Sequence, residues 1–145
     1  MKVDIEIDGL DGVVKAIMRS DPEIHRAIAG SMYEAAYIVE GRAKALVLEP
    51  PKTGRLYKRG KVTVHQASAP GEAPASDTGN LAGSIQQDVD EAALKARISA
   101  QTPYAEALEF GTRKMEARPF MRRALAESEK DVADAVRDAI KKVKL

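Results

Sequence analysis

The chain has 145 residues, the commonest size for a single compact domain. Its 23 Lys plus Arg are balanced by 22 Asp plus Glu, and the net charge of +1 gives no overall electrostatic case for a nucleic-acid binder. The absence of cysteine excludes a disulfide scaffold, a thiolate metal site and a cysteine nucleophile, and it fits a protein made in a reducing cytosol.

The N-terminal residues 2 to 7 alternate between polar and apolar side chains, which predicts a strand with Val3, Ile5 and Ile7 on its inner face and charge on the other. The apolar spacing then becomes helical and predicts a short helix ending near Ser20. Its apolar positions are Leu10, Val13, Val14 and Ile17. Because no signal-peptide run and no stretch of ~20 apolar residues occurs, we expect a soluble, unexported protein with no membrane partner.

A second, long helix is predicted from Ser20 to about Val47, followed by the helix-ending Pro50. Ser20 is expected to cap it, Pro22 suits its first turn, and Glu23 completes a capping box with Ser20. Its many small alanines favour close packing, either onto a sheet or against the same helix of a neighbouring subunit. Its apolar positions are Ile24, Ile28, Met32, Ala35, Val39, Ala43 and Leu46.

Residues 48 to 80 are rich in Pro, Gly, Ser, Thr and Lys, which predicts a long loop. Within it, residues 55 to 60 and 61 to 66 could pair as a hairpin, whereas 67 to 76 should be irregular. A loop of more than ~15 residues in so small a domain is either disordered or functional. We therefore predict that residues 50 to 76 form an extended arm that reaches a partner and gains order there.

The second half of the chain predicts two more strands and a second long helix. In chain order the expected elements are a helical turn within 77 to 83, an antiparallel hairpin of strands 84 to 89 and 94 to 100, a short helix 104 to 110 and a final helix after residue 119. The whole chain, residues 1 to 145, is thus predicted to be a single α+β domain. A small antiparallel sheet should pack against two long helices, with a long Pro/Gly-rich loop or hairpin arm.

The sequence offers little for catalysis or for holding a metal. His25 lies within a predicted helix and His65 in the loop, without other ligands at metal-binding spacing. We therefore expect no enzyme activity, no cofactor and no small-molecule substrate. Asp88 and Asp90 lie two apart on a strand and could form a carboxylate pair in a small hydrolase, but such residues are more often a solvated edge.

A basic segment, residues 52 to 61, is the one local charge asymmetry. It contains Lys52, Arg55, Lys58, Arg59 and Lys61 with no acid between them. Such a segment can meet an acidic partner or nucleic-acid phosphates, although composition alone favours a solvated hairpin tip. One tyrosine is little for base stacking. The residues proposed for the assembly arm are Arg55, Leu56, Tyr57, Lys58 and Arg59.

Residues 104 to 121 contain both phenylalanines of the chain. One interpretation is that Tyr104, Leu108, Phe110 and Phe120 anchor a turn on the core, and we expect this of at least Leu108 and Phe120. Packing does not explain the polar run of residues 111 to 114 between two helices. An exposed polar loop on a rigid support is the usual geometry for recognition.

Three signatures in this order resemble a known family, the small tail-completion, or head–tail joining, proteins of siphophages and related prophages. They are Thr53-Gly54-Arg55-Leu56-Tyr57 leading to His65-Gln66-Ala67-Ser68-Ala69-Pro70-Gly71-Glu72-Ala73-Pro74, then Asp77-Thr78-Gly79-Asn80-Leu81 with Ser84-Ile85, then Tyr104-Ala105 through Leu108-Glu109-Phe110-Gly111-Thr112 and Arg118-Pro119-Phe120. Together they cover roughly residues 53 to 125. Each signature alone would be weak.

The resemblance implies a non-catalytic α+β subunit of the phage virion, assembled in the bacterial host cytoplasm. At the neck a ring of copies, expected to be a hexamer, would cap the tail tube protein and present a surface to the head-connector or stopper proteins. DNA would be met only on its passage through the channel. The matching positions are expected to shape the subunit, and their role in the ring interface is a hypothesis: Tyr104, Glu109, Phe110, Gly111, Thr112, Arg113, Arg118, Pro119 and Phe120.

The alternative reading, from another functional class, is a nucleic-acid-binding accessory protein that uses the basic segment 52 to 61. Phosphate contacts would make its affinity fall steeply as salt rises, whereas a ring subunit should bind DNA weakly at any salt concentration.

Overall fold

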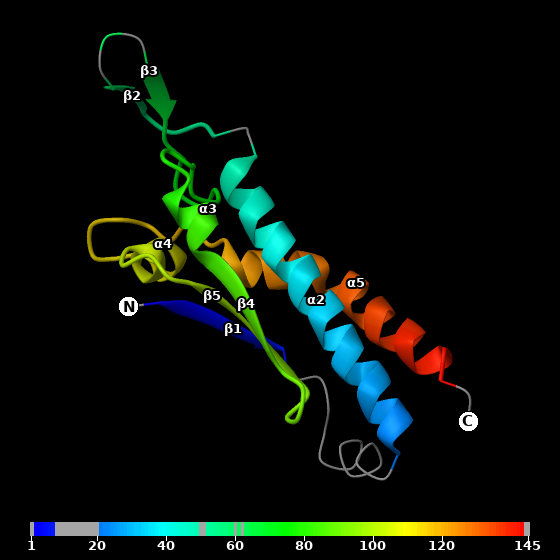
Figure 1. Ribbon diagram of the computed structural model, residues 1–145. Helices are drawn as coiled ribbons and strands as arrows, with labels where there is room; N and C mark the ends of the chain where they lie inside the picture. Colours follow the sequence, from blue (N-terminus) through cyan, green and yellow to red (C-terminus); the bar gives the residue numbers. More distant parts are fainter. Residues whose placement is uncertain (1, 8–20, 50–51, 60, 62, 144–145) are drawn as a thin grey trace.

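A computed structural model of the chain describes residues 2–7, 21–49, 52–59, 61 and 63–143. The predicted α+β architecture is confirmed, because a small antiparallel sheet packs against two long helices (Figure 1). The elements are β1 (Val3–Ile7), α2 (Pro22–Leu48), β2 (Leu56–Arg59), β3 (Thr63–Gln66), α3 (Asn80–Ser84), β4 (Ile85–Asp90), β5 (Lys95–Ala100), α4 (Ala105–Phe110) and α5 (Met121–Lys141). The helix predicted before Ser20 lies outside the described residues.

The main sheet has the order β1-β5-β4, with both pairings antiparallel. The predicted hairpin of β4 and β5 is confirmed. Strand β1 pairs with the other edge of β5, which places Val3 opposite Ala100. Alternation buries Val3 and Ile7 against the helices and leaves the other face charged, as predicted for the first strand. In the sheet described here, β1 and β4 are the two edge strands.

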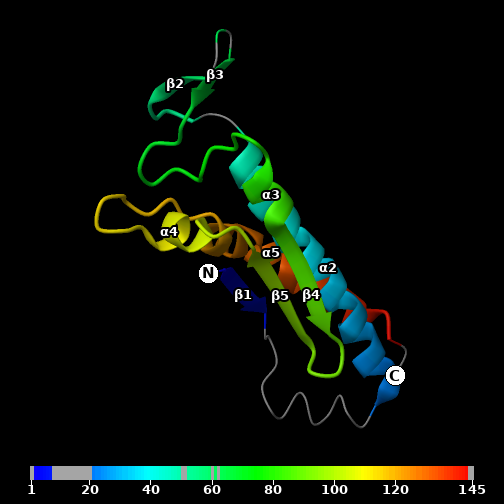
Figure 2. The same ribbon diagram turned by 60° about the vertical axis from the view of Figure 1, so that its left-hand side comes forward.

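Helix α2 packs on β4 and β5 and runs beside α5 (Figures 1 and 2). Its N-cap is Asp21, whose carboxylate accepts the amide N–H groups of Glu23 at 2.9 Å and Ile24 at 3.3 Å. The prediction that Ser20 caps this helix was therefore wrong. Small buried side chains, such as Ala35, Ala36, Val39 and Ala43, line the helix as the sequence predicted.

The core lies between the inner face of the sheet and the two long helices. Phe120 is fully buried in it and Leu108 packs against it from its edge, as predicted for both. Tyr104 and Phe110 are instead exposed, Phe110 by 62% of its surface, so the interpretation as core anchors holds for Leu108 and Phe120 but not for these two residues. In the described part of the chain, neither the long nor the short helices contain an apolar stretch that would span a bilayer.

Strands β2 and β3 form a separate two-stranded sheet that projects from the body (Figures 1 and 2). They pair antiparallel, with Leu56 opposite Gln66 and Lys58 opposite Val64, so the predicted hairpin is confirmed for the described residues. Residues 67 to 76 contain neither helix nor strand, also as predicted. Among the described elements the hairpin packs substantially only on itself. We call residues 52 to 76 the arm.

Candidate functional site

The base of the arm is fastened to the body by buried or half-buried polar contacts. The ammonium group of Lys52 donates to the carbonyl of Leu46, in the last turns of α2, at 2.7 Å and to that of Ala73 at 3.1 Å. Burial lowers the pKa of Lys52. The amide of Ser76 donates to the carbonyl of Val47 at 3.2 Å. These bonds hold the beginning and the end of the arm against the C-terminal end of α2.

Glu72 organises the same base from within the arm. Its carboxylate accepts the amide N–H of Ala69 at 2.8 Å, the amide N–H of Thr53 at 3.0 Å and the hydroxyl of Thr53. The Thr53 hydroxyl and then the two amides stabilise the charged form, which lowers the pKa of Glu72 to about 2. An ionised Glu72 therefore joins the two ends of the arm.

Gly54 lets the two chain segments of the arm approach closely. Its amide donates to the carbonyl of Ala67 at 2.9 Å, and the amide of Ala67 donates to the carbonyl of Arg55 at 3.0 Å. A Cβ atom at position 54 would lie 2.6 Å from the Ala67 carbonyl oxygen and nearer still to that of Ser68. Only glycine fits here without a shift of backbone.

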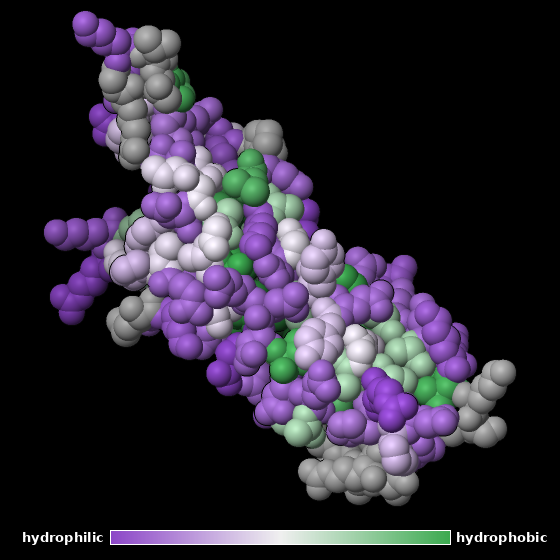
Figure 3. Space-filling model, in the orientation of Figure 1, coloured by the Kyte–Doolittle hydropathy of each residue, from purple (hydrophilic) through white to green (hydrophobic). Residues whose placement is uncertain are grey.

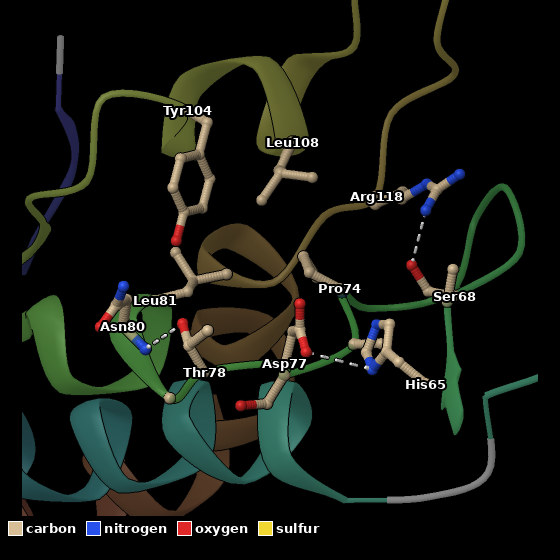
Figure 4. A pocket seen from close by; sticks show the side chains of 14 residues that line it. His65, Ser68, Pro74, Asp77, Thr78, Asn80, Leu81, Tyr104, Leu108 and Arg118 are labelled. Atoms are coloured by element: carbon tan, nitrogen blue, oxygen red, sulfur yellow. Dashed lines mark hydrogen bonds and ion pairs between the residues drawn. The ribbon is translucent and has the colours of Figure 1, made fainter. Parts of the chain in front are cut away.

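A hollow of about 450 Å³ lies between the arm base, α3 and α4 (Figure 4). All three signature segments contribute to its walls, which include His65, Ser68, Asp77, Leu81, Leu108 and Arg118. The guanidinium of Arg118 donates from Nη1 to the Ser68 hydroxyl at 2.9 Å, which ties the segment before α5 to the arm. Segments distant in sequence are thus joined at one place.

The hollow contains Ser, His and Asp side chains but not a hydrogen-bonded catalytic relay. His65 Nδ1 is 3.8 Å from Asp77 Oδ1, which is longer than a hydrogen bond. Ser68 bonds to Arg118, and no hydrogen bond links it to His65 in the described structure. The described residues also contain no group of three or more His, Cys, Asp or Glu placed to hold a metal.

Glu109 in the third signature caps the final helix. It is 1% exposed, and its carboxylate accepts the amide N–H groups of Phe120 at 2.8 Å, Met121 at 3.0 Å and Arg122 at 3.0 Å. These are amides that a helix start leaves unpaired. The N-cap residue Phe120 has no side-chain acceptor, so a carboxylate from α4 takes that place. The Arg122 guanidinium lies 3.6 Å from the same carboxylate.

The signature residues after Glu109 build a tight exposed loop. Gly111 has φ +78°, and a Cβ there would lie 2.8 Å from the amide nitrogen of Ala117 and 2.9 Å from the Met115 carbonyl oxygen. The Thr112 amide donates to that same carbonyl at 2.8 Å. Thr112 and Arg113 are exposed, as the polar run predicted. Pro119 is partly buried directly before Phe120.

The free end of the arm exposes both apolar and basic side chains. Leu56 is 62% and Val64 is 55% exposed, and the register puts them with Lys58 on one face of the hairpin. On the other face the Arg55 guanidinium lies 5.4 Å from the Tyr57 ring centre. Arg59 ends β2. Among the residues coloured at this end in Figure 3, most are hydrophilic and a small hydrophobic area is visible beside them.

Asp88 and Asp90 lie on the exposed face of β4, as their spacing predicted. Asp88 is opposite Arg97 in the neighbouring strand, and the Asp90 carboxylate accepts the Ala93 amide at 2.9 Å within the turn. This arrangement is that of a solvated sheet edge rather than of two convergent carboxylates in a cleft.

The sequence reasoning missed the roles of Glu72 and Glu109. For Glu109 a signal was available, because the helix after Pro119 begins without Ser, Thr, Asp or Asn at its start and so needs an acceptor from elsewhere. For Glu72 no local pattern marks the contact with Thr53, because the loop brings them together only when folded.

Comparison with protein-family models, curated proteins and solved structures finds no match to this chain.

Proposed function

We propose that this chain is a non-catalytic structural subunit of a tailed-bacteriophage virion, which forms a ring at the neck that completes the tail and joins it to the head. The observation that carries the proposal is the arm. It is a two-stranded sheet with exposed Leu56, Tyr57 and Val64 and with little packing on its own subunit. Isolated hairpins are marginally stable in water, so such an element gains most from a partner surface.

The anchoring of the arm also supports this proposal. Its base is held by Lys52, Glu72 and Arg118, whereas Leu56 and Val64 on its hairpin are exposed. A rigid base directs the tip toward a fixed place outside the subunit, as a subunit joined to copies of itself requires. The location at the neck and the hexameric ring are what the resemblance to siphophage tail-completion proteins implies.

The three signatures support the proposal through their placement. They meet around the hollow at the arm base, where they fix how the arm leaves the body. Glu109 and Gly111 shape the segment that carries Arg118 to this place. The residues that carry the resemblance thus lie together where the arm joins the body of the subunit.

Electron microscopy of the protein mixed with siphophage tail tubes that lack their tail-completion protein tests the proposal. We expect rings at one end of each tube and tubes that become competent to join heads. Tubes without rings, together with a protein that stays monomeric at micromolar concentration, would reject it. An arm variant with Leu56→Ser and Val64→Ser should bind tubes much more weakly.

A nucleic-acid-binding accessory protein is the second candidate. It is favoured by the exposed side chains of Arg55, Lys58 and Lys61, which make no ion pair with any described residue. A DNA titration from 50 to 200 mM salt distinguishes the two candidates. For each phosphate contact of this accessory protein, the logarithm of the affinity would fall by about 0.9 per tenfold increase in salt. The neck subunit should show weak binding throughout.

A further inference from the structure

The outer edge of β4 is a second surface on which no described strand pairs. Within the described sheet β4 pairs only with β5, which leaves its other edge unpaired. Such an edge is a template on which another strand can pair. The segment 85 to 91, which forms β4 and starts the following turn, contains three carboxylates and no cation. These are Asp88, Asp90 and Glu91, and we call them the acidic edge.

Aromatic side chains of α2 lie beside the acidic edge. The Tyr33 hydroxyl donates to the Glu91 carboxylate at 2.7 Å, and this bond raises the pKa of Tyr33. Tyr37, one helical turn further along α2, is 72% exposed. The strand edge, its carboxylates and the two rings therefore form one surface.

A hollow next to Tyr33 adds to this surface. It has a volume of about 670 Å³ and is lined by Gly30, Tyr33 and Glu91 among others. A Cβ on Gly30 would meet no atom within 4 Å, so packing within the subunit does not require glycine there. Glycine weakens a helix, and its presence opens this exposed place on α2 to closer approach.

The arm complements the acidic edge in charge and in polarity. Lys58 and Lys61 are exposed cations of the arm, and residues 85 to 91 contain three carboxylates. The cations opposite these carboxylates in β5, Lys95 and Arg97, both form ion pairs with Glu6. Leu56 and Val64 offer apolar surface to the tyrosines, and the exposed strands of the hairpin offer their own backbone edges. Opposite potentials on two surfaces are typical of specific pairing.

We propose that the arm of one copy docks along the acidic edge of the next copy, with Lys58 facing Asp88, Asp90 and Glu91, and with Leu56 and Val64 covering Tyr33 and Tyr37. This inference rests on the proposed function and names the subunit contact within it. A copy does not reach its own edge, because the arm and the β4–β5 turn lie at opposite ends of the molecule (Figures 1 and 2). The contact joins two different surfaces, as a closed ring requires.

Disulfide trapping tests the contact directly, because the chain contains no cysteine of its own. A chain with both Lys58→Cys and Asp88→Cys should, on mild oxidation, give covalent dimers, trimers and higher species on a non-reducing gel. The matched control combines Lys58→Cys with Lys130→Cys, an exposed position on α5, and should stay monomeric. Equal cross-linking in both chains would overturn the proposal.

A charge exchange gives an independent reading of the same pair. Lys58→Glu alone and Asp88→Arg alone should each weaken self-association about tenfold by sedimentation, and the double variant should recover most of that loss. Lys130→Glu is the control and should leave association unchanged. Circular dichroism checks that each variant is folded. Loss in the Lys58 variant without loss in the Asp88 variant would overturn the proposed docking site.

The outcomes separate this inference from the proposed function. Rings on tail tubes without cross-linking between positions 58 and 88 would reject the docking site and leave the neck proposal standing. Cross-linked oligomers that never engage tail tubes would support the contact and reject the neck. If Lys58→Glu abolishes DNA binding while association is unchanged by either charge reversal, the arm is a nucleic-acid element and the docking proposal falls.

Discussion

Glu109 is the residue whose loss should harm the fold most among the signature positions. Its buried carboxylate accepts three backbone amides at the start of α5, so Glu109→Ala leaves these donors unpaired away from water. We expect the free energy of unfolding to fall by about 2–3 kcal/mol. Urea denaturation followed by circular dichroism measures the change.

Two further variants test whether this loss comes from the capping contact. Glu109→Gln keeps an oxygen acceptor but places an NH₂ donor against an amide, so it should lose an intermediate amount, about 1 kcal/mol. Glu106→Ala removes a neighbouring carboxylate of α4 that makes no such contact and should stay within about 0.5 kcal/mol of the parent. Similar losses at positions 106 and 109 would contradict the assignment of the cap.

Gly111 and Gly30 should respond to alanine with opposite signs. At Gly111, φ is +78° and a Cβ would lie 2.8 Å from a backbone nitrogen, so Gly111→Ala should destabilise by more than about 1 kcal/mol. At Gly30, in the middle of α2, no atom lies within 4 Å, so Gly30→Ala should stabilise the monomer by about 0.5–1 kcal/mol. Thermal unfolding of the two variants in parallel gives the comparison.

The base of the arm should depend on pH through Glu72. The folded chain lowers the pKa of Glu72 from 4.5 to about 2, so its contribution to stability is complete above about pH 4.5 and is lost as the pH falls toward 2. The amide proton shifts of Thr53 and Ala69 in nuclear magnetic resonance spectra should titrate with a midpoint near 2. Glu72→Gln should remove this titration, and a midpoint near 4.5 would show that the contacts do not form in solution.

Single-residue roles could be predicted from sequence only where their cause is local. The place of Pro22 at the start of α2 follows from neighbouring residues, and this prediction agrees with the structure. Ser20 and Asp21 are equally suited to capping, and the backbone geometry selects Asp21. The contact of Glu109 with the start of α5 arises from tertiary folding, which residue type alone does not reveal.

At the level of elements, the arm should be separable from the body. Among the described elements, β2 and β3 pack substantially only on each other. Replacing residues 56 to 66 by a short Gly-Ser turn should therefore leave the melting temperature within about 4 °C of the parent, which corresponds to a loss of about 1 kcal/mol or less. Calorimetry measures it, and sedimentation should show lost self-association. A large fall in melting temperature would mean that the arm stabilises its own subunit.

Sequence patterns predicted the elements and the two hairpin pairings, but not the partner of β1. The two-residue alternation of β1, β4 and β5 and the helical spacing of α2 and α5 are local properties, and the observed bounds differ from the predicted ones by a few residues. The β4–β5 pairing follows from a short turn. The pairing of β1 with β5 joins opposite parts of the chain, and no local pattern specifies it.

For the whole molecule, assembly should change the exchange of arm amides more than that of core amides. Hydrogen exchange of the isolated subunit and of the assembled ring should show new protection in residues 52 to 66, with little change in β5, whose amides already lie between two strands. Equal protection of the arm in both states would argue that it has no partner in the ring. The sequence pointed to this arm through its composition, but not to β4 as its counterpart.

The arm and the acidic edge each occur once per subunit, and the arm lies at the end of the molecule opposite the β4–β5 turn. If they bind one another, an open row of subunits of any length leaves one arm and one acidic edge unbound, whereas a closed ring leaves none unbound. The last joining step then gains a contact without recruiting another molecule, so lone subunits and complete circles should coexist with few partial rows between them.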